Sequence, residues 1–251
     1  MSKIVNVRKV KFGEGMPKIC IPITDADLAG LKNSVSAILS SPFDFVEWRA
    51  DFYQNVQKPE ICSQAMTLLR KELGEAPILF TIRTSLEMGK LEISTEAYVK
   101  ANLYVINSGL VDLVDVELSR GETAVKTLVE AAHQKGVKIV MSRHDFAQTP
   151  AKEVIIKDLC TMQNLGADIA KFAVMPKTER DVLTMLDATL TMKEEHNSTP
   201  VITMSMGHFG MVSRVCGQLV GSCVTFGTAG KASAPGQLPA TDVALFLKSL
   251  A

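Results

Sequence analysis

The amino-acid sequence predicts an α/β fold, a single (β/α)8 TIM barrel that spans residues 1–251 as one domain. The length of 251 residues is close to the roughly 250 residues typical of this barrel. Short runs rich in apolar and β-branched residues recur about every 30 residues, and stretches of helical periodicity separate them. This alternation is typical of repeated βα units around a parallel sheet.

Eight strands are predicted in chain order, preceded by a hairpin. The strands are residues 18–23, 45–51, 78–84, 111–118, 138–144, 169–175, 201–206 and 223–227. Ahead of them, residues 4–11, followed by Gly13-Glu14-Gly15, predict a short N-terminal β-hairpin that closes the bottom of the barrel.

Several of the intervening helices have recognisable ends. The helix after the fifth strand is predicted to begin at Thr149 and Pro150 and to end at Gly166. In the next helix, Thr178 and Asp181 form a capping-box pattern. The apolar faces are predicted to be Ile155, Leu159 and Met162 in the first helix, Val182, Leu186 and Leu190 in the second, and Met211, Val215 and Leu219 in a third.

The composition argues against several classes of function. The 27 Lys and Arg residues balance the 27 Asp and Glu residues, so we expect binding neither to nucleic acid nor to a membrane surface. No apolar run approaches the ~20 residues needed to cross a bilayer, and the first residues lack a signal-peptide core, so we expect a cytoplasmic protein. The four histidines are scattered and the five cysteines form no C-x-x-C motif, so we expect no metal site.

Charged residues gather at the C-terminal ends of the predicted strands, where barrels of this class place their active groups. Strand alternation places on a common face Glu47 with Arg49, Asp115 with Glu117, and Ser142 with His144. These charges could form a structural ion-pair network that fills the mouth of the barrel. Burying so many charges is costly unless they serve a site, which favours an active site here.

Lys171 lies in an otherwise apolar predicted strand. Burial disfavours the ammonium form, and the neutral amine is the form that adds to a carbonyl to give a Schiff base. The alternative is a lysine ion-paired with a carboxylate of a neighbouring strand. His144 ends the adjacent strand and suits proton removal beside an imine, with Glu87 setting its tautomer, unless it is a satisfied core histidine.

Two glycine-containing loops follow the seventh and eighth strands, at residues 207–210 and 227–231. Loops in these positions often bind phosphate in barrels of this class. Arg214, nearby in the sequence, could hold a carboxylate or a phosphate through two parallel hydrogen bonds. The alternative interpretation is that Arg214 is a solvated arginine on the surface.

Segments along almost the whole chain resemble one enzyme family. They include Gly13-Glu14-Gly15, Glu47-Trp48-Arg49, Phe80-Thr81-Ile82-Arg83-Thr84, Asp115-Val116-Glu117, His144-Asp145-Phe146, Lys171 with Ala173-Val174-Met175-Pro176, Thr203-Met204-Ser205-Met206-Gly207, Ser213-Arg214 and Ser233-Ala234-Pro235-Gly236-Gln237. Together these segments resemble type I 3-dehydroquinate dehydratases, lyases of the shikimate pathway.

The resemblance implies a reaction and a set of site residues. Lys171 would form the Schiff base, His144 would act as general acid and base, and Glu87 would orient His144. The implied substrate-binding residues are Glu47, Trp48, Arg49 and Arg83, together with Arg214, Ser233 and Gln237 at the carboxylate end. The enzyme would remove water from 3-dehydroquinate to give 3-dehydroshikimate through a covalent imine, as a homodimer and without a metal or cofactor.

The sequence departs from the family pattern at three places. Some members have serine at the position of Pro22, many have asparagine at that of Arg143, and the loop Met88-Gly89-Lys90 often reads Gly-Gly-Glu. Two rival functions are a Schiff-base aldolase of a sugar phosphate and a non-catalytic barrel that binds a metabolite. Arg214 with Gln237 fits a carboxylate at least as well as a phosphate, and the intact Lys171 argues against a silent barrel.

Overall fold

The eight barrel strands run parallel and follow one another around a ring in the computed structural model, which describes residues 3–250. They are β3 (Lys18–Ile23), β4 (Phe45–Arg49), β5 (Ile78–Thr81), β6 (Leu113–Glu117), β7 (Lys138–Asp145), β8 (Ile169–Val174), β9 (Val201–Ser205) and β10 (Val224–Thr228). Between β9 and β10 the ring closes through a parallel bridge of Val201 with Ser222. The short strand β11 (Leu238–Pro239) adds to β10. The predicted barrel is therefore confirmed.

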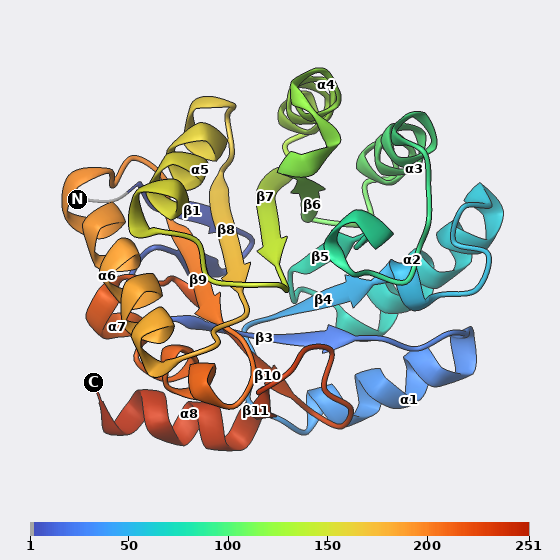
Figure 1. Ribbon diagram of the computed structural model, residues 1–251. Coiled ribbons are helices and arrows are strands. Elements are labelled where there is room, and N and C mark those ends of the chain that lie inside the picture. The colour runs from blue at the N-terminus through green and yellow to red at the C-terminus, as the bar shows by residue number, and fades with distance from the viewer. Residues whose placement is uncertain (1–2, 251) are drawn as a thin grey trace.

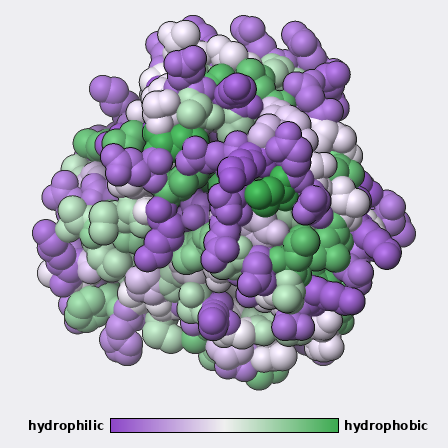
Figure 2. All heavy atoms as spheres, turned by 90° about the vertical axis from the view of Figure 1, so that its right-hand side faces the viewer, coloured by the Kyte–Doolittle hydropathy of each residue, from purple (hydrophilic) through white to green (hydrophobic). Residues whose placement is uncertain are grey.

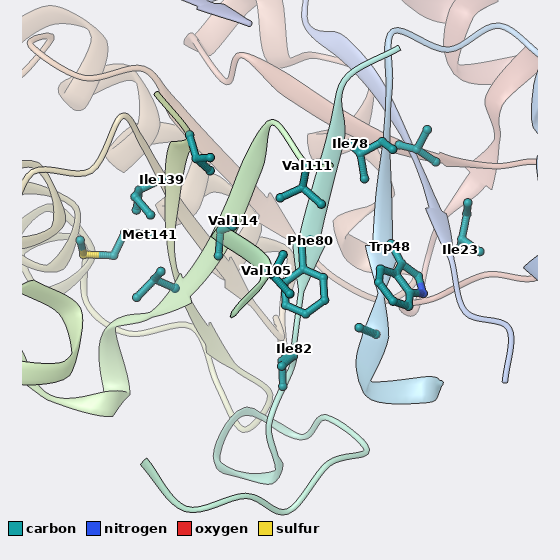
Figure 3. Packing of buried hydrophobic residues seen from close by; sticks show 14 of the residues in the cluster. Ile23, Trp48, Ile78, Phe80, Ile82, Val105, Val111, Val114, Ile139 and Met141 are labelled. Carbon is teal, nitrogen blue, oxygen red and sulfur yellow. The ribbon is translucent and has the colours of Figure 1, made fainter. Parts of the chain in front are cut away.

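The helices form a layer outside the strands (Figure 1). They are α1 (Leu28–Leu39), α2 (Pro59–Leu73), α3 (Thr95–Asn107), α4 (Glu122–Gln134), α5 (Lys152–Asn164), α6 (Glu179–Glu195), the short α7 (Gly217–Val220) and α8 (Ala240–Ser249). Outward-facing strand residues such as Phe80, Val114 and Met141 pack against the apolar faces of these helices, which removes apolar surface from water (Figure 3). Successive strand residues point to opposite faces, so the residues between them point into the barrel.

The N-terminal hairpin covers the end of the barrel where the strands begin. Strands β1 (Val5–Val7) and β2 (Val10–Phe12) pair antiparallel. The side chains of Val5, Val7 and Phe12 belong to one buried cluster with inward residues of the strands. Phe12 packs edge-on against Phe45 with ring centroids 5.1 Å apart. This packing confirms the predicted hairpin and leaves the C-terminal ends of the strands as the open end.

Helix ends agree with the prediction in one helix and differ in another. The capping box of α6 is confirmed, because the Asp181 amide donates to Thr178 Oγ1 and the Thr178 amide donates to Asp181 Oδ2. In contrast, α5 begins at Lys152 rather than at Pro150. The Asp145 carboxylate accepts the amides of the two residues after Phe146 and forms a turn there, which delays the helix.

Two predicted helix faces need correction. In α6, Val182 is buried as expected, but Leu186 and Leu190 are only half-buried and the buried face continues through Met185 and Met192. The helix predicted around residues 211–219 is divided into a 3-10 segment, η4 (Phe209–Arg214), and the four-residue α7. The chain turns tightly after β9, and a Cβ at Gly210 would lie 2.1 Å from the Ser205 carbonyl oxygen.

Figure 2 shows one face of the molecule, on which hydrophilic side chains are mixed with apolar patches. Within residues 3–250, each helix is too short or too polar to cross a membrane.

Candidate active site

The inner face of the barrel changes from apolar at the bottom to charged at the C-terminal ends of the strands. Strand register places Ser142 beside both Glu117 and Lys171. Glu117 and Asp115 are fully buried, and Lys171 is 4% exposed. The sequence prediction that these side chains share the interior is therefore confirmed.

A cavity of about 180 Å³ lies at this end of the barrel. Of the ten predicted site residues, seven line it: Glu47, Arg49, Arg83, His144, Lys171, Ser233 and Gln237. Glu87 does not line the cavity but contacts Arg83 and His144, which do. Arg214 contacts Met204, which is part of the cavity wall. The cavity also has apolar walls, which the site prediction did not include. They are formed by Phe146, Met204, Met206 and Phe226.

Lys171 lies against two carboxylates and an aromatic ring. Its Nζ is 3.4 Å from Glu47 Oε1, 3.8 Å from Asp115 Oδ2 and 4.7 Å from the centroid of the Phe226 ring. Burial alone would raise the pKa of Glu47, but the positive charges of Lys171 and nearby arginines outweigh it and hold that pKa below its ordinary value. Lys171 is thus both buried and ion-paired, and Glu47 is its nearest carboxylate.

His144 and Glu87 are in hydrogen-bond contact. Its Nδ1 lies 2.8 Å from Glu87 Oε2, and Glu87 Oε1 accepts a hydrogen bond of 2.8 Å from Ser119. Burial, followed by the charges of Arg83 and Lys171, holds the pKa of His144 well below its ordinary value, so the imidazole is neutral at pH 7. The donors on both Glu87 oxygens favour its carboxylate, which assigns the proton to Nδ1 of His144 and leaves Nε2 free to take a proton.

Burial shifts the pKa of Glu87 in the opposite direction to that of His144. It raises the pKa of this carboxyl group above its ordinary value, and the Arg83 guanidinium and the Ser119 hydroxyl offset only part of that rise. Glu87 is the last residue of the 3-10 segment η2 (Ser85–Glu87), which begins two residues after Arg83 in the loop that follows β5. The loop therefore fixes the distance between the carboxylate and the histidine.

Arg83 is surrounded by carboxylates. Its Nη2 lies 2.9 Å from Asp115, and its Nη1 lies 2.9 Å from Glu117 and 3.2 Å from Glu87. Glu117 also contacts Arg120 at 3.3 Å. The sequence analysis considered a structural ion-pair network as an alternative to an active site. Such a network is present, and it holds the Arg83 side chain in place at the cavity. The predicted site residues did not include Asp115, Glu117 or Arg120, although the first two were expected to share an inward face.

Arg49 forms a paired contact with its neighbour Asp51. The distances are 2.8 Å from Nε to Oδ1 and 2.9 Å from Nη2 to Oδ2. The guanidinium also lies over the Phe52 ring, 5.0 Å from its centroid, within the 3-10 segment η1 (Ala50–Phe52) that holds Asp51. The charge of Arg49 is thus compensated, while the side chain still lines the cavity.

Arg214 is a buried cation without a carboxylate partner in the described part of the chain. It is 2% exposed, its Nη2 donates to the Pro235 carbonyl at 2.8 Å, and its Nε has no partner. Burial lowers the pKa of this guanidinium to about 10. The predicted surface alternative is therefore excluded. Nearby, Gln237 exchanges hydrogen bonds with Ser233 at the cavity wall, so this side of the site is rich in donors.

Trp48 lies on the opposite face of its strand from the cavity. Its side chain is fully buried between the strands and the helices, and it packs edge-on against Tyr53 and Phe80 at 5.6 and 5.5 Å (Figure 3). This position corrects the prediction that Trp48 binds substrate. The alternation that turns Glu47 inward turns Trp48 outward.

The departures from the family pattern lie in different surroundings. Arg143 points away from the interior, as expected, and forms an ion pair with Asp158. Met88 and Lys90 both line the cavity. Among residues 3–250, no group of three or more His, Cys, Asp or Glu side chains is placed to hold a metal ion.

Comparison with known proteins identifies a family. The model of the type I 3-dehydroquinase family matches residues 19–251. A 3-dehydroquinate dehydratase from Clostridium kluyveri is 45% identical over 249 residues, which cover 99% of this chain and 98% of the relative. One from Syntrophotalea carbinolica is 48% identical over 246 residues, covering 98% of this chain and 97% of the relative.

A solved structure gives the same result. The crystal structure of type I 3-dehydroquinate dehydratase from Clostridium difficile, with covalently modified comenic acid, is 42% identical in sequence. It matches 100% of this chain and 98% of its own with a TM-score of 0.97. The chain therefore belongs to the type I 3-dehydroquinase family.

Proposed function

We propose that the cavity at the mouth of the barrel dehydrates 3-dehydroquinate to 3-dehydroshikimate through an imine formed on Lys171. The overall activity, that of a hydro-lyase of the shikimate pathway, follows from membership of the family. The observation that supports the imine most strongly is the position of Lys171, buried at the cavity beside a neutral histidine.

The first step is attack by the Lys171 amine on the substrate carbonyl. The ammonium must first lose a proton, and Glu47 Oε1, at 3.4 Å, is the nearest carboxylate acceptor. The carbonyl oxygen then leaves as water, and a protonated imine remains. Its positive charge forms next to Asp115 and over the Phe226 ring, both of which stabilise a cation.

The second step uses His144 twice. The protonated imine acidifies the adjacent C–H bond, and His144 Nε2 removes that proton, so the electron pair moves into the imine and gives an enamine. The enamine expels the hydroxyl on the next carbon, which takes the proton from His144 and leaves as water. Hydrolysis of the resulting imine releases the product and restores Lys171, so the net change is the loss of one water molecule.

The carboxylate of the substrate is proposed to bind on the side of the cavity where Arg214 lies. A buried guanidinium without a counter-charge is costly, and a bound anion removes that cost. Ser233 and Gln237 supply further donors at the same wall, while Glu47, Arg49 and Arg83 face the cavity where the substrate hydroxyls would lie.

A dehydration assay tests this function. The purified chain is mixed with 3-dehydroquinate, and formation of the conjugated product is followed by its ultraviolet absorbance and by mass spectrometry, with and without EDTA. We expect the same turnover in both samples, because the proposed steps use only side chains. Loss of turnover in EDTA that a divalent ion restores would contradict them.

We extend the proposal to a cytoplasmic homodimer, which the resemblance to the family supports. Light scattering coupled to size-exclusion chromatography should give twice the mass of the 27.2 kDa chain. A monomeric mass at micromolar concentration would contradict the dimer without affecting the proposed reaction.

A further inference from the structure

We propose that Lys90 is a further substrate-recognition residue, whose ammonium attracts the anionic substrate to the mouth of the cavity. The inference rests on the proposed function, because it takes the anion 3-dehydroquinate as the substrate. Lys90 is exposed to solvent and lines the active-site cavity. It therefore lies where an entering substrate passes.

The backbone around Lys90 is held in place by the active site itself. The Lys90 amide donates to Asp51 Oδ2 at 3.2 Å, and the Gly89 amide donates to the Thr84 carbonyl at 2.8 Å. A Cβ added at Gly89 would lie 1.9 Å from the Arg83 carbonyl oxygen, so the loop crosses directly over Arg83. These contacts hold the loop between β5 and α3 in place (Figure 1). Lys90 belongs to this loop.

The charges around the cavity explain why an additional cation matters. Five carboxylates and five cations belong to the site: Glu47, Asp51, Glu87, Asp115 and Glu117, and Arg49, Arg83, Arg120, Lys171 and Arg214. With His144 neutral these ten charges cancel, and transfer of a proton from Lys171 to Glu47 leaves that sum unchanged. Lys90 is a sixth cation, so it gives the mouth of the cavity a net positive charge that attracts an anion.

Lys90 also differs from four of these five cations in its pairing. Within residues 3–250 its ammonium has no ion-pair partner, whereas Arg49, Arg83, Arg120 and Lys171 each contact at least one carboxylate. An unpaired charge on the rim of a cavity acts mainly on the rate of association and on its salt dependence. The alternative is a solvated surface lysine with no influence on the substrate.

Steady-state kinetics of charge variants test the proposal. For Lys90→Gln we expect kcat/KM at low ionic strength to fall by roughly 3- to 10-fold, and for Lys90→Glu by roughly 10- to 50-fold, with kcat nearly unchanged. The difference from wild type should shrink as salt rises, because salt screens exposed charges over about 10 Å at 0.1 M. Lys100→Gln is the matched control, since Lys100 is an exposed lysine on α3 that does not line the cavity.

The outcomes separate this inference from the proposed function. If Lys90→Gln and Lys90→Glu retain the kcat/KM of the Lys100→Gln control at low salt, the inference is wrong and the dehydratase reaction stands. If kcat falls while the salt dependence is unchanged, Lys90 acts on the chemical step and recognition at the mouth is also overturned. Absence of dehydration by the wild-type chain would instead remove the proposed function.

Discussion

His144 Nδ1 and Glu87 Oε2 lie 2.8 Å apart, although the two residues are 57 positions apart in the chain. The contact joins the end of β7 to the loop after β5, and Arg83 Nη1 lies 3.2 Å from the same Glu87 oxygen. The tautomer of the histidine is therefore set by a carboxylate that an arginine also holds in position.

Replacing Glu87 by Gln should lower kcat by about 10- to 100-fold while KM changes little. The amide no longer favours Nδ1–H on His144, so the nitrogen that faces the substrate is less often a base. Glu153→Gln, an exposed change on α5, is the control. An unchanged kcat would show that the contact does not orient the base.

Replacing His144 by Ala should reduce turnover by about 10²- to 10⁴-fold or more, because the proposed mechanism uses the same group in deprotonation and in the departure of water. Lys171 still supplies the amine, so the imine should form and accumulate. Rapid-quench borohydride trapping measures that accumulation. Near-normal turnover would make His144 a core residue, and Glu87 would become the first candidate for the base.

The pH dependence follows from the lowered pKa of His144. Burial and the positive charges of Arg83 and Lys171 keep the folded-state pKa well below 6.5, so the acid limb of kcat/KM should lie below pH 6.5. An acid limb above pH 7 would contradict the assignment of His144 as the base.

The same shift predicts a loss of stability in acid. The unfolded chain protonates His144 near pH 6.5, whereas the folded chain does so only at lower pH. The unfolded state therefore binds more protons as pH falls from about 6.5, and the free energy of unfolding decreases. Urea unfolding at several pH values should show a smaller decrease in His144→Asn.

Replacing Arg214 by Met should raise KM by about 10- to 100-fold, because a charged hydrogen bond to the substrate carboxylate is lost. The same change removes an unpaired buried charge, so the free energy of unfolding should stay within about 1 kcal/mol of wild type or increase. Urea unfolding and steady-state kinetics measure the two effects. An unchanged KM would place the substrate carboxylate elsewhere.

The fold could be predicted from the sequence because its signals are local. Alternating apolar residues give the strands, Thr178 with Asp181 gives a helix start, and strand parity brings Ser142 and His144 to the interior. Parity also placed Arg143 outside, where it pairs with Asp158. These features depend on neighbours only a few residues away.

The prediction of the site was less complete than that of the fold. Trp48 belongs to a conspicuous motif, but the alternation that turns Glu47 inward turns Trp48 toward the helices, so local parity already argued against a substrate contact. Arg83 contacts Asp115 and Glu117, which lie 32 and 34 positions away in the chain, and no local pattern encodes that pairing. The burial of Arg214 arises because η4 turns back against β9.

The central claim, an imine on Lys171, is tested most directly by borohydride reduction in the presence of 3-dehydroquinate, followed by peptide mass mapping. The account predicts that the peptide containing Lys171 gains the mass of a reduced substrate adduct, that no adduct forms without substrate, and that Lys171→Ala abolishes it. Trapping of a sugar phosphate in its place would favour an aldolase. An unmodified wild-type protein that still turns over 3-dehydroquinate would contradict the imine.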